Sequence, residues 1–180
     1  MTDLDPHRDA LVRASRHLHA TGLVTGTSGN LSVRVDEVVL VTPSGVDYDA
    51  LEPDGIAAVR IDGELLDRGA SSPSSETPLH LGIYRTSDAR AIVHTHAPWA
   101  TALGLVRDDL PSVHYAILGL GGPLRVAPYA TFGSQELADH VRTAMVDRKA
   151  ALMRNHGAVA SGGTLGEAVR NAEQVEWLAR

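Results

Sequence analysis

The stretch Ala91-Ile92-Val93-His94-Thr95-His96 runs from apolar residues directly into two histidines that are separated by one residue. The apolar run predicts a buried β-strand. Because successive side chains of a strand point to opposite faces, both imidazoles would project from the same face at the end of this strand. Imidazole nitrogens are frequent zinc ligands, so His94 and His96 are candidate ligands of one metal ion. A surface pair of histidines explains the spacing alone equally well.

A third histidine strengthens the metal interpretation. His156 follows a second apolar run, Ala151-Leu152-Met153, and precedes Gly157, which permits a tight turn. Two histidines close in sequence plus a distant one are typical of a catalytic zinc site with an open coordination position. Glu76 is the candidate for a base or fourth ligand, although a solvated carboxylate near a helix start also suits its place. Four other histidines lack such partners and are interpreted as structural or surface residues: His7, His80, His114 and His140.

Three loops rich in small hydroxyl side chains precede the paired histidines, at residues 25–30, 42–45 and 71–78. Such loops can direct backbone N–H groups at an anion. The third is predicted to open a helix with Thr77 as N-cap and Pro78 as first residue, and a helix N-terminus also favours an anion. Together the loops indicate a phosphate site, although each alone is equally typical of an ordinary turn. No Walker or dinucleotide-binding motif is present.

The composition narrows the class of protein. The chain has 180 residues, 43% of them hydrophobic, and a formal net charge of −6. The acidic balance and the lack of a basic run argue against nucleic-acid binding, and no apolar stretch approaches the roughly 20 residues of a membrane-spanning helix. The absence of cysteine excludes disulfides and thiolate catalysis and suits a cytoplasmic enzyme. Lys149, the only lysine, lies at a predicted helix end, which disfavours a Schiff-base mechanism.

The rest of the chain predicts alternating helices and strands. Helices are expected at 4–20, 78–84, 98–105, 134–146 and 164–180. Two hairpins are expected, 31–34 with 38–42 and 57–61 with 64–66, and further strands at 113–118, 124–126, 151–153 and 158–160. This order predicts a single α/β domain over residues 1–180, with a mixed sheet covered by helices.

Six motifs in chain order carry a resemblance to a known family: Gly26-Thr-Ser-Gly-Asn-Leu-Ser-Val-Arg34, Thr42-Pro-Ser-Gly45, Pro73-Ser-Ser-Glu76, His94-Thr-His96, Ala127-Pro-Tyr-Ala-Thr-Phe-Gly133 and Asn155-His-Gly157. Together they resemble the class II aldolase/adducin family over nearly the whole chain, most closely its branch that acts on L-fuculose 1-phosphate. The resemblance implies a mixed, mostly antiparallel central sheet flanked by helices. It also implies a cyclic homotetramer with active sites at subunit interfaces, acting on a small phosphorylated sugar without nucleic-acid or membrane partners.

The resemblance also implies a chemistry. A zinc-dependent aldolase of this type reversibly cleaves a ketose 1-phosphate to dihydroxyacetone phosphate and an aldehyde. One Zn²⁺ per subunit, or another divalent metal, would be held by His94, His96 and His156, with Glu76 as acid/base and candidate fourth ligand. Tyr115 resembles the tyrosine that a neighbouring subunit supplies to the aldehyde oxygen. Six residues resemble the cradle for the substrate phosphate: Thr27, Asn30, Ser44, Gly45, Ser74 and Ser75.

Related reactions stay open at this point. Aldolases or dehydratases that take 5-deoxypentulose or 5-methylthioribulose 1-phosphates fit the same motifs. A pentulose-5-phosphate 4-epimerase is less favoured, because in that branch we expect an aspartate where Glu76 stands. The three histidines disfavour the non-enzymatic adducin head. The chain ends at Arg180 within a predicted helix, whereas family members of this type continue with a C-terminal tail that carries a further catalytic tyrosine; that tail is expected to be missing here.

Overall fold

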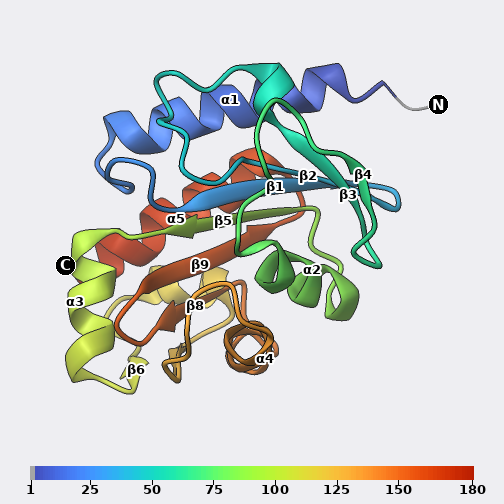
Figure 1. The fold of residues 1–180 in the computed structure, drawn as a ribbon. Helices are drawn as coiled ribbons and strands as arrows, with labels where there is room; N and C mark the ends of the chain where they lie inside the picture. Colours follow the sequence, from blue (N-terminus) through green and yellow to red (C-terminus); the bar gives the residue numbers. More distant parts are fainter. Residues whose placement is uncertain (1–2) are drawn as a thin grey trace.

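A nine-stranded sheet runs through the centre of the structure, in the strand order β4-β3-β2-β1-β5-β9-β8-β7-β6 (Figure 1). The structure is a computed structural model that describes residues 3–180. Within these residues only β7 and β8 pair in parallel, so the expected mixed, mostly antiparallel sheet of a single α/β domain is confirmed. The strands are β1 (Asn30–Val35), β2 (Val38–Val41), β3 (Ala57–Arg60), β4 (Leu65–Asp67), β5 (Ala91–Thr95), β6 (Asp109–Leu110), β7 (Leu124–Ala127), β8 (Ala150–Met153) and β9 (Gly157–Gly162).

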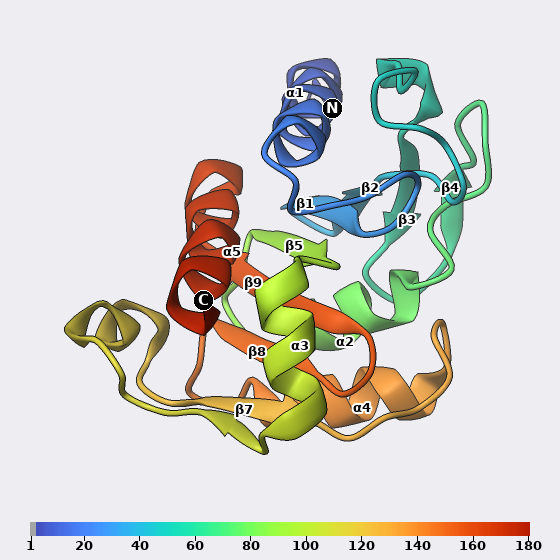
Figure 2. The same cartoon turned by 90° about the vertical axis from the view of Figure 1, so that its left-hand side faces the viewer.

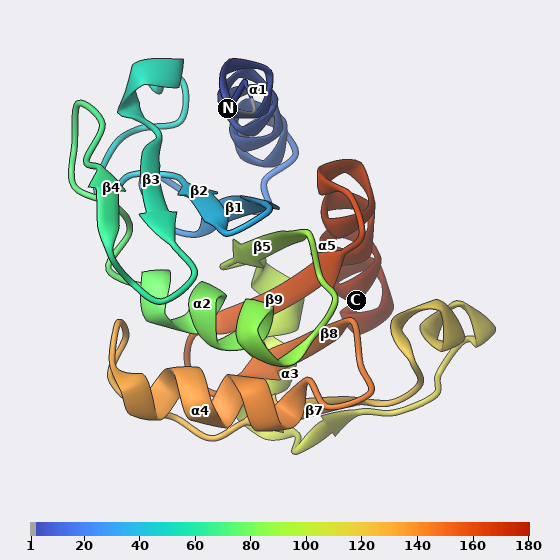
Figure 3. The ribbon, with the colours of Figure 1, turned by 90° about the vertical axis from the view of Figure 1, so that its right-hand side faces the viewer.

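Helices cover both faces of this sheet. The helices α1, α3 and α5 pack on one face, and α2 and α4 pack on the other. Figure 2 shows α3 in front of β8 and β9, and Figure 3 shows α2 and α4 on the opposite side. The helices are α1 (Asp5–Ala20), α2 (Thr77–Thr86), α3 (Pro98–Val106), α4 (Gln135–Ala144) and α5 (Leu165–Ala179), with 3₁₀-helices η1 (Pro53–Gly55) and η2 (Tyr115–Leu120). None of the described helices is both long and apolar enough to cross a membrane.

The two faces of the sheet have separate apolar cores, because side chains alternate along each strand. On β1, Leu31 and Val33 pack into the core under α1, α3 and α5. Ser32 lies between them in the chain and faces α2, where its hydroxyl contacts His80. On β5, Ile92 belongs to the core under α2 and α4. The α2 face of the sheet therefore carries polar side chains on β1 beside an apolar core.

One predicted strand is wrong. Residues 113–118 lead into the 3₁₀-helix η2 instead of pairing with the sheet. The imidazole of His114 accepts a hydrogen bond from the backbone N–H of Ala116 at 3.1 Å and caps this helix. Val113 and Tyr115 are mostly exposed and only Ile117 of that alternating set is buried, so the segment lacks the continuous buried face of a strand. A β-rich composition alone did not predict this local capping.

The N-cap assignment at α2 is also wrong, while the other predicted helices and strands are present with ends close to those expected. Thr77 is the first helical residue, and Glu76 occupies the N-cap position. The hydroxyl of Thr77 donates to the backbone oxygen of Ser74 at 2.6 Å. This places the carboxylate of Glu76, and not a hydroxyl, at the helix start beside the sheet.

Three segments that lie far apart in the sequence meet at one end of the central strands β1, β5 and β9. Asn30, the first residue of β1, pairs with His94 near the end of β5. His156 lies in the turn between β8 and β9, which Met153 and Gly157 close as a pair. A Cβ on Gly157 would lie 2.1 Å from the backbone oxygen of Thr95, so this close approach of β5 to the turn requires glycine. The pairing thus brings His94 and His156 to one point.

Candidate active site

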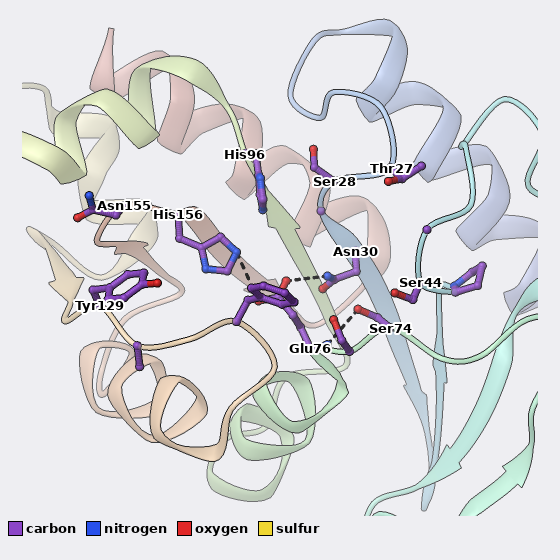
Figure 4. A pocket seen from close by; sticks show the side chains of 16 residues that line it. Thr27, Ser28, Asn30, Ser44, Ser74, Glu76, His96, Tyr129, Asn155 and His156 are labelled. Carbon is purple, nitrogen blue, oxygen red and sulfur yellow. Dashed lines mark hydrogen bonds and ion pairs between the residues drawn. The ribbon is translucent and has the colours of Figure 1, made fainter.

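Three imidazoles and one carboxylate converge at this end of the strands. Figure 4 shows three of the four side chains, those of His96, His156 and Glu76. The ring centroids of His94, His96 and His156 are 4.8, 4.8 and 4.9 Å apart. The Nε2 atoms of His94 and His96 lie 3.0 Å apart, and Glu76 Oε2 lies 3.0 Å from His94 Nε2. Glu76 Oε1 is 3.5 Å from His156 Nε2. Each of the four side chains offers a ligand atom within 4.8 Å of the others, so the structure brings the four predicted metal-site residues together.

The hydrogen bonds of His94 decide which nitrogen it presents to this cluster. Its Nδ1 lies 2.9 Å from the backbone oxygen of Ala158, which can only accept, so Nδ1 carries a proton. In the neutral ring, Nε2 then points a lone pair at His96 and Glu76. The buried Oε1 of Glu76 has no hydrogen-bond partner among the residues that the structure describes. A divalent cation would satisfy both groups, and three imidazole nitrogens with one carboxylate oxygen are a donor set that fits zinc.

The four groups also shift one another's protonation. Burial raises the pKa of Glu76, but the neighbouring charges and hydrogen bonds, led by His94, outweigh burial and lower that pKa well below its ordinary value. Burial and the charge of His94 lower the pKa of His96 to about 4 and also lower the pKa of His156. Burial lowers the pKa of His94, but the charge and hydrogen bond of Glu76 and the backbone hydrogen bond of Ala158 together raise it, so the net shift is upward. A proton and a divalent cation would therefore compete for Nε2 of His94.

Glu76, His96 and His156 line a cavity of about 290 Å³, just below the usual range for small-molecule sites, and His94 is buried behind them. The three hydroxyl-rich loops form other walls (Figure 4). Pro43 and Pro73 pair as an isolated β-bridge, and Ser44 N–H donates to the backbone oxygen of Ser72 at 3.0 Å, which joins the second loop to the third. All six residues predicted to hold the phosphate line this cavity: Thr27, Asn30, Ser44, Gly45, Ser74 and Ser75.

Asn30 also contacts Glu76, one of the four candidate metal ligands, directly. Its side-chain N–H donates to Glu76 Oε2 at 2.9 Å, and its Oδ1 lies 2.5 Å from Nε2 of His80. His80, predicted as a structural or surface residue, is fully buried on α2. The signal that could have connected it to the site is spacing, since His80 follows Glu76 by four residues, one helical turn.

Three further cavity residues with aromatic or amide side chains were not predicted individually: Tyr129, Phe132 and Asn155. Their motifs are visible in the sequence, but an aromatic or amide side chain in a loop carries no spacing signal for a site. Gly133 allows the loop that carries Tyr129 and Phe132 to approach Ser75 closely, because a Cβ at this position would lie 2.9 Å from the backbone oxygen of Ser75. Asn155 has a left-handed backbone with φ 57°, a conformation that asparagine tolerates better than most residues.

Two residues singled out in the sequence lie away from the cavity. Tyr115, on η2, is 80% exposed and does not line the cavity of its own chain. Lys149 forms a surface ion pair with Glu167 at 2.8 Å, and no lysine is among the described residues that line the cavity. The site therefore offers no lysine for a Schiff base.

Known proteins resemble this chain over most of its length. The 5-deoxy-D-ribulose 1-phosphate aldolase of Bacillus thuringiensis is 37% identical, over 98% of this chain and 84% of that protein. The L-fuculose phosphate aldolase of Escherichia coli K12 is 42% identical, over 88% of this chain and 74% of that protein. A solved structure of an L-fuculose 1-phosphate aldolase superposes with a TM-score of 0.95 at 38% identity, covering 99% of this chain and 85% of that one.

The family predicted from the six motifs is confirmed by a match to a whole-domain profile. The profile for the class II aldolase and adducin N-terminal domain matches residues 9–180, nearly the full chain. The matched range includes the four candidate metal ligands, the three hydroxyl-rich loops and the loop at residues 128–133. The chain therefore belongs to the class II aldolase and adducin family.

Proposed function

We propose that this protein is a zinc-dependent aldolase that reversibly cleaves a ketose 1-phosphate, such as L-fuculose 1-phosphate, to dihydroxyacetone phosphate and an aldehyde. The observation that carries the proposal is the convergence of His94, His96, His156 and Glu76 at a cavity that the last three line together with hydroxyl-rich loops. The lack of a lysine there supports metal chemistry over a Schiff base. A cytoplasmic location remains our expectation from the cysteine-free composition.

His94, His96 and His156 would hold the metal, and Glu76 would be the fourth ligand before substrate binds. A bound divalent cation would act as a Lewis acid on the negative charge that develops as the C3–C4 bond breaks. Glu76 would move the proton at C3 of dihydroxyacetone phosphate. Its Oε2 is already engaged by Asn30 and His94, whereas Oε1 has no hydrogen-bond partner within residues 3–180 and is the oxygen available for that transfer.

The phosphate would be held without lysine. Small hydroxyl groups and backbone N–H groups of the three loops line the cavity, and Ser74 and Ser75 immediately precede the N-terminus of α2. A helix N-terminus and aligned N–H groups favour an anion at this place. The same groups would fix the distance from the phosphate to the metal cluster and so set which carbon–carbon bond reaches Glu76.

The aldehyde oxygen would be served by Tyr115 of a neighbouring subunit in a homotetramer. What supports this part of the proposal is the surface around η2, where several large apolar side chains are at least half exposed on one chain: Trp99, Val113, Tyr115, Leu118 and Trp177. His114 bridges this set, since its ring lies against Tyr115 and 4.9 Å from the ring of Trp177. Exposed apolar surface of this kind is typical of an interface between subunits.

A second candidate substrate is a 5-deoxypentulose or 5-methylthioribulose 1-phosphate. Two relatives similar to almost the whole chain are aldolases of 5-deoxyribulose 1-phosphate, one of them also of 5-methylthioribulose 1-phosphate. These sugars share the phosphorylated three-carbon half with L-fuculose 1-phosphate and differ only in the aldehyde that leaves. The metal cluster and loops would treat them alike, so the choice depends on the residues that meet the aldehyde half, such as Tyr129 and Phe132.

The test is a substrate panel with identified products. Zinc-loaded protein would be incubated with L-fuculose 1-phosphate, 5-deoxyribulose 1-phosphate, 5-methylthioribulose 1-phosphate and L-ribulose 5-phosphate. We expect dihydroxyacetone phosphate from at least one 1-phosphate, with lactaldehyde from the first sugar or acetaldehyde from the second. Loss of water without carbon–carbon cleavage would indicate a dehydratase, and epimerised pentulose 5-phosphate would indicate an epimerase; either result would overturn the aldolase assignment.

A further inference from the structure

A line of buried polar side chains leads from Glu76 into the protein, between β1 and α2. Asn30 Oδ1 lies 2.5 Å from His80 Nε2, Ser32 Oγ lies 2.6 Å from His80 Nδ1, and Tyr84 Oη lies 2.8 Å from Ser32 Oγ. These four residues are at most 4% exposed. Buried polar groups cost free energy unless their hydrogen bonds are made, so an uninterrupted line needs an explanation. The mechanism above uses Asn30 but not the other three.

Regular spacing builds this line. Asn30 and Ser32 are two residues apart on β1 and so share the face toward α2. His80 and Tyr84 are four residues apart on α2 and so lie on one side of the helix. The two pairs interdigitate, with His80 between Asn30 and Ser32. Glu76, one further turn back at the start of α2, meets the open end of the line.

The charge of Glu76 sets the direction of the first two hydrogen bonds. An ionised carboxylate can only accept, so the NH₂ group of Asn30 must face Glu76 Oε2, at 2.9 Å. The Oδ1 of Asn30 then faces His80 and can also only accept. His80 must therefore carry its proton on Nε2.

The remaining hydrogen bonds follow from a neutral His80. Burial lowers the pKa of His80 to about 3, and the charge of His94 adds to the effect, so the ring is neutral at physiological pH. With Nε2 protonated, Nδ1 is an acceptor and receives the hydroxyl proton of Ser32. Ser32 has no second proton to give, so its oxygen accepts from the hydroxyl of Tyr84. Burial raises the pKa of Tyr84, which keeps it a donor. Every donor in the line points toward Glu76.

We propose that His80 is a positioning residue for Glu76. The N–H on Nε2 of His80 holds the amide of Asn30 in the one orientation that donates to Oε2, and this reserves Oε1 for the transferred proton. A proton that arrives on Oε1 leaves Oε2 an acceptor, so no hydrogen bond in the line has to reverse during turnover. Without the N–H of His80, the Asn30 amide can turn its oxygen toward Glu76, and the repulsion displaces the carboxylate. The role of Glu76 rests on the proposed function, whereas the hydrogen-bond directions do not.

Two substitutions separate this role from simple filling of space. His80→Met keeps a similar volume but no N–H donor, and His80→Gln keeps an N–H donor of similar reach. We expect kcat for ketose 1-phosphate cleavage to fall about 10- to 100-fold in His80→Met, as is usual when a group that orients a site residue is lost, with KM and zinc content little changed. His80→Gln should recover most of kcat, and His17→Met, on the outer helix α1, should match wild type. Equal activity of the Met and Gln variants, or a loss confined to KM or zinc content, would overturn the proposal.

The direct readout needs no substrate. In zinc-loaded protein labelled with ¹⁵N-histidine, long-range ¹H–¹⁵N correlations identify which ring nitrogen carries the proton, and the His80→Gln variant assigns the His80 signals by their disappearance. We expect the Nε2–H tautomer; the Nδ1–H tautomer or a doubly protonated ring would overturn the proposal, whether or not His80→Met folds. A wild-type protein that shows the Nε2–H tautomer but cleaves no sugar phosphate would overturn the proposed function and leave the hydrogen-bond directions standing.

Discussion

The Nε2 atoms of His94 and His96 lie 3.0 Å apart, while Nδ1 of His94 is committed to the backbone oxygen of Ala158. Two imidazole nitrogens at this distance repel each other unless a proton or a cation lies between them. Glu76 brings a negative oxygen to the same point, also at 3.0 Å from His94. Strand pairing and the β8–β9 turn hold these groups in place, so the fold itself gathers a metal-binding donor set.

We expect one divalent metal ion per chain, zinc in the first instance, and we expect His94→Ala to lose it. Removing one of three nitrogens leaves a donor set that holds zinc much more weakly. Elemental analysis of protein purified without chelator measures the content. His7→Ala serves as the control, because His7 lies near the N-terminus on α1 and is not among the candidate metal ligands; this variant should keep the metal. Wild-type metal content in His94→Ala would show that the cluster is not the metal site.

Glu76→Gln should keep the fold and much of the metal but lose most aldol cleavage. The amide has the shape of the carboxylate but cannot take up a proton, and a positioned acid/base typically contributes about 10² to 10⁴ in rate. Steady-state kcat on the best ketose 1-phosphate measures the effect, with zinc content determined on the same samples. Turnover near the wild-type rate would reduce Glu76 to a carboxylate at a helix start.

Ser75→Ala should weaken use of phosphorylated substrates specifically. Hydrogen bonds to charged groups contribute on the order of 1.5–3 kcal/mol, so kcat/KM for the 1-phosphate should fall about 10- to 100-fold. The control is Ser71→Ala, in the same loop but outside the residues that line the cavity. The neutral sugar L-fuculose lacks the phosphate, and any slow cleavage of it should be unchanged by Ser75→Ala. An equal loss on both sugars would mean that the loop does not hold the phosphate.

The buried His80 should make the metal-free protein sensitive to acid. Burial lowers its pKa from 6.5 to about 3, so on acidification the unfolded chain takes up a proton well before the folded one does. The free energy of unfolding therefore falls as the pH drops through this window, by at most about 1.4 kcal/mol per pH unit from this group. Urea unfolding between about pH 6.5 and 4.5 avoids most of the glutamate titration. We expect a smaller acid loss in His80→Gln than in wild type; equal losses would contradict a neutral, buried His80.

Much of the site could be predicted from the sequence because its signals are local. An apolar run that ends in His94-Thr95-His96 defines a strand and two converging imidazoles, and glycine after His156 marks a turn. The hydroxyl-rich loops can be recognised from their content of serine, threonine and glycine. The six motifs in order then indicated the family, and the family resemblance implied the metal ligands, the role of Glu76 and the phosphate-binding residues. These features share the property that neighbouring residues in the chain are neighbours in the site.

The remaining features depend on contacts between distant segments. The pairing of Asn30 with His94 follows from the strand order, which hairpin signals alone do not give. His80 was placed among structural or surface residues because its partners, Asn30 and Ser32, lie about fifty positions earlier in the chain. The strand predicted at 113–118 was wrong because of a local contact. The composition there is β-like, but the segment does not pair with the described sheet, and the side chain of His114 caps a 3₁₀-helix.

The central claim is that this cavity performs metal-dependent cleavage of a ketose 1-phosphate. The most direct measurement is a zinc titration of metal-free protein while the release of dihydroxyacetone phosphate from L-fuculose 1-phosphate and 5-deoxyribulose 1-phosphate is followed. We predict negligible release without metal, a rise with added Zn²⁺ that saturates near one equivalent per chain, and no rise in His94→Ala. Full activity in the metal-free protein, or no release from either sugar at saturating zinc, would contradict the account.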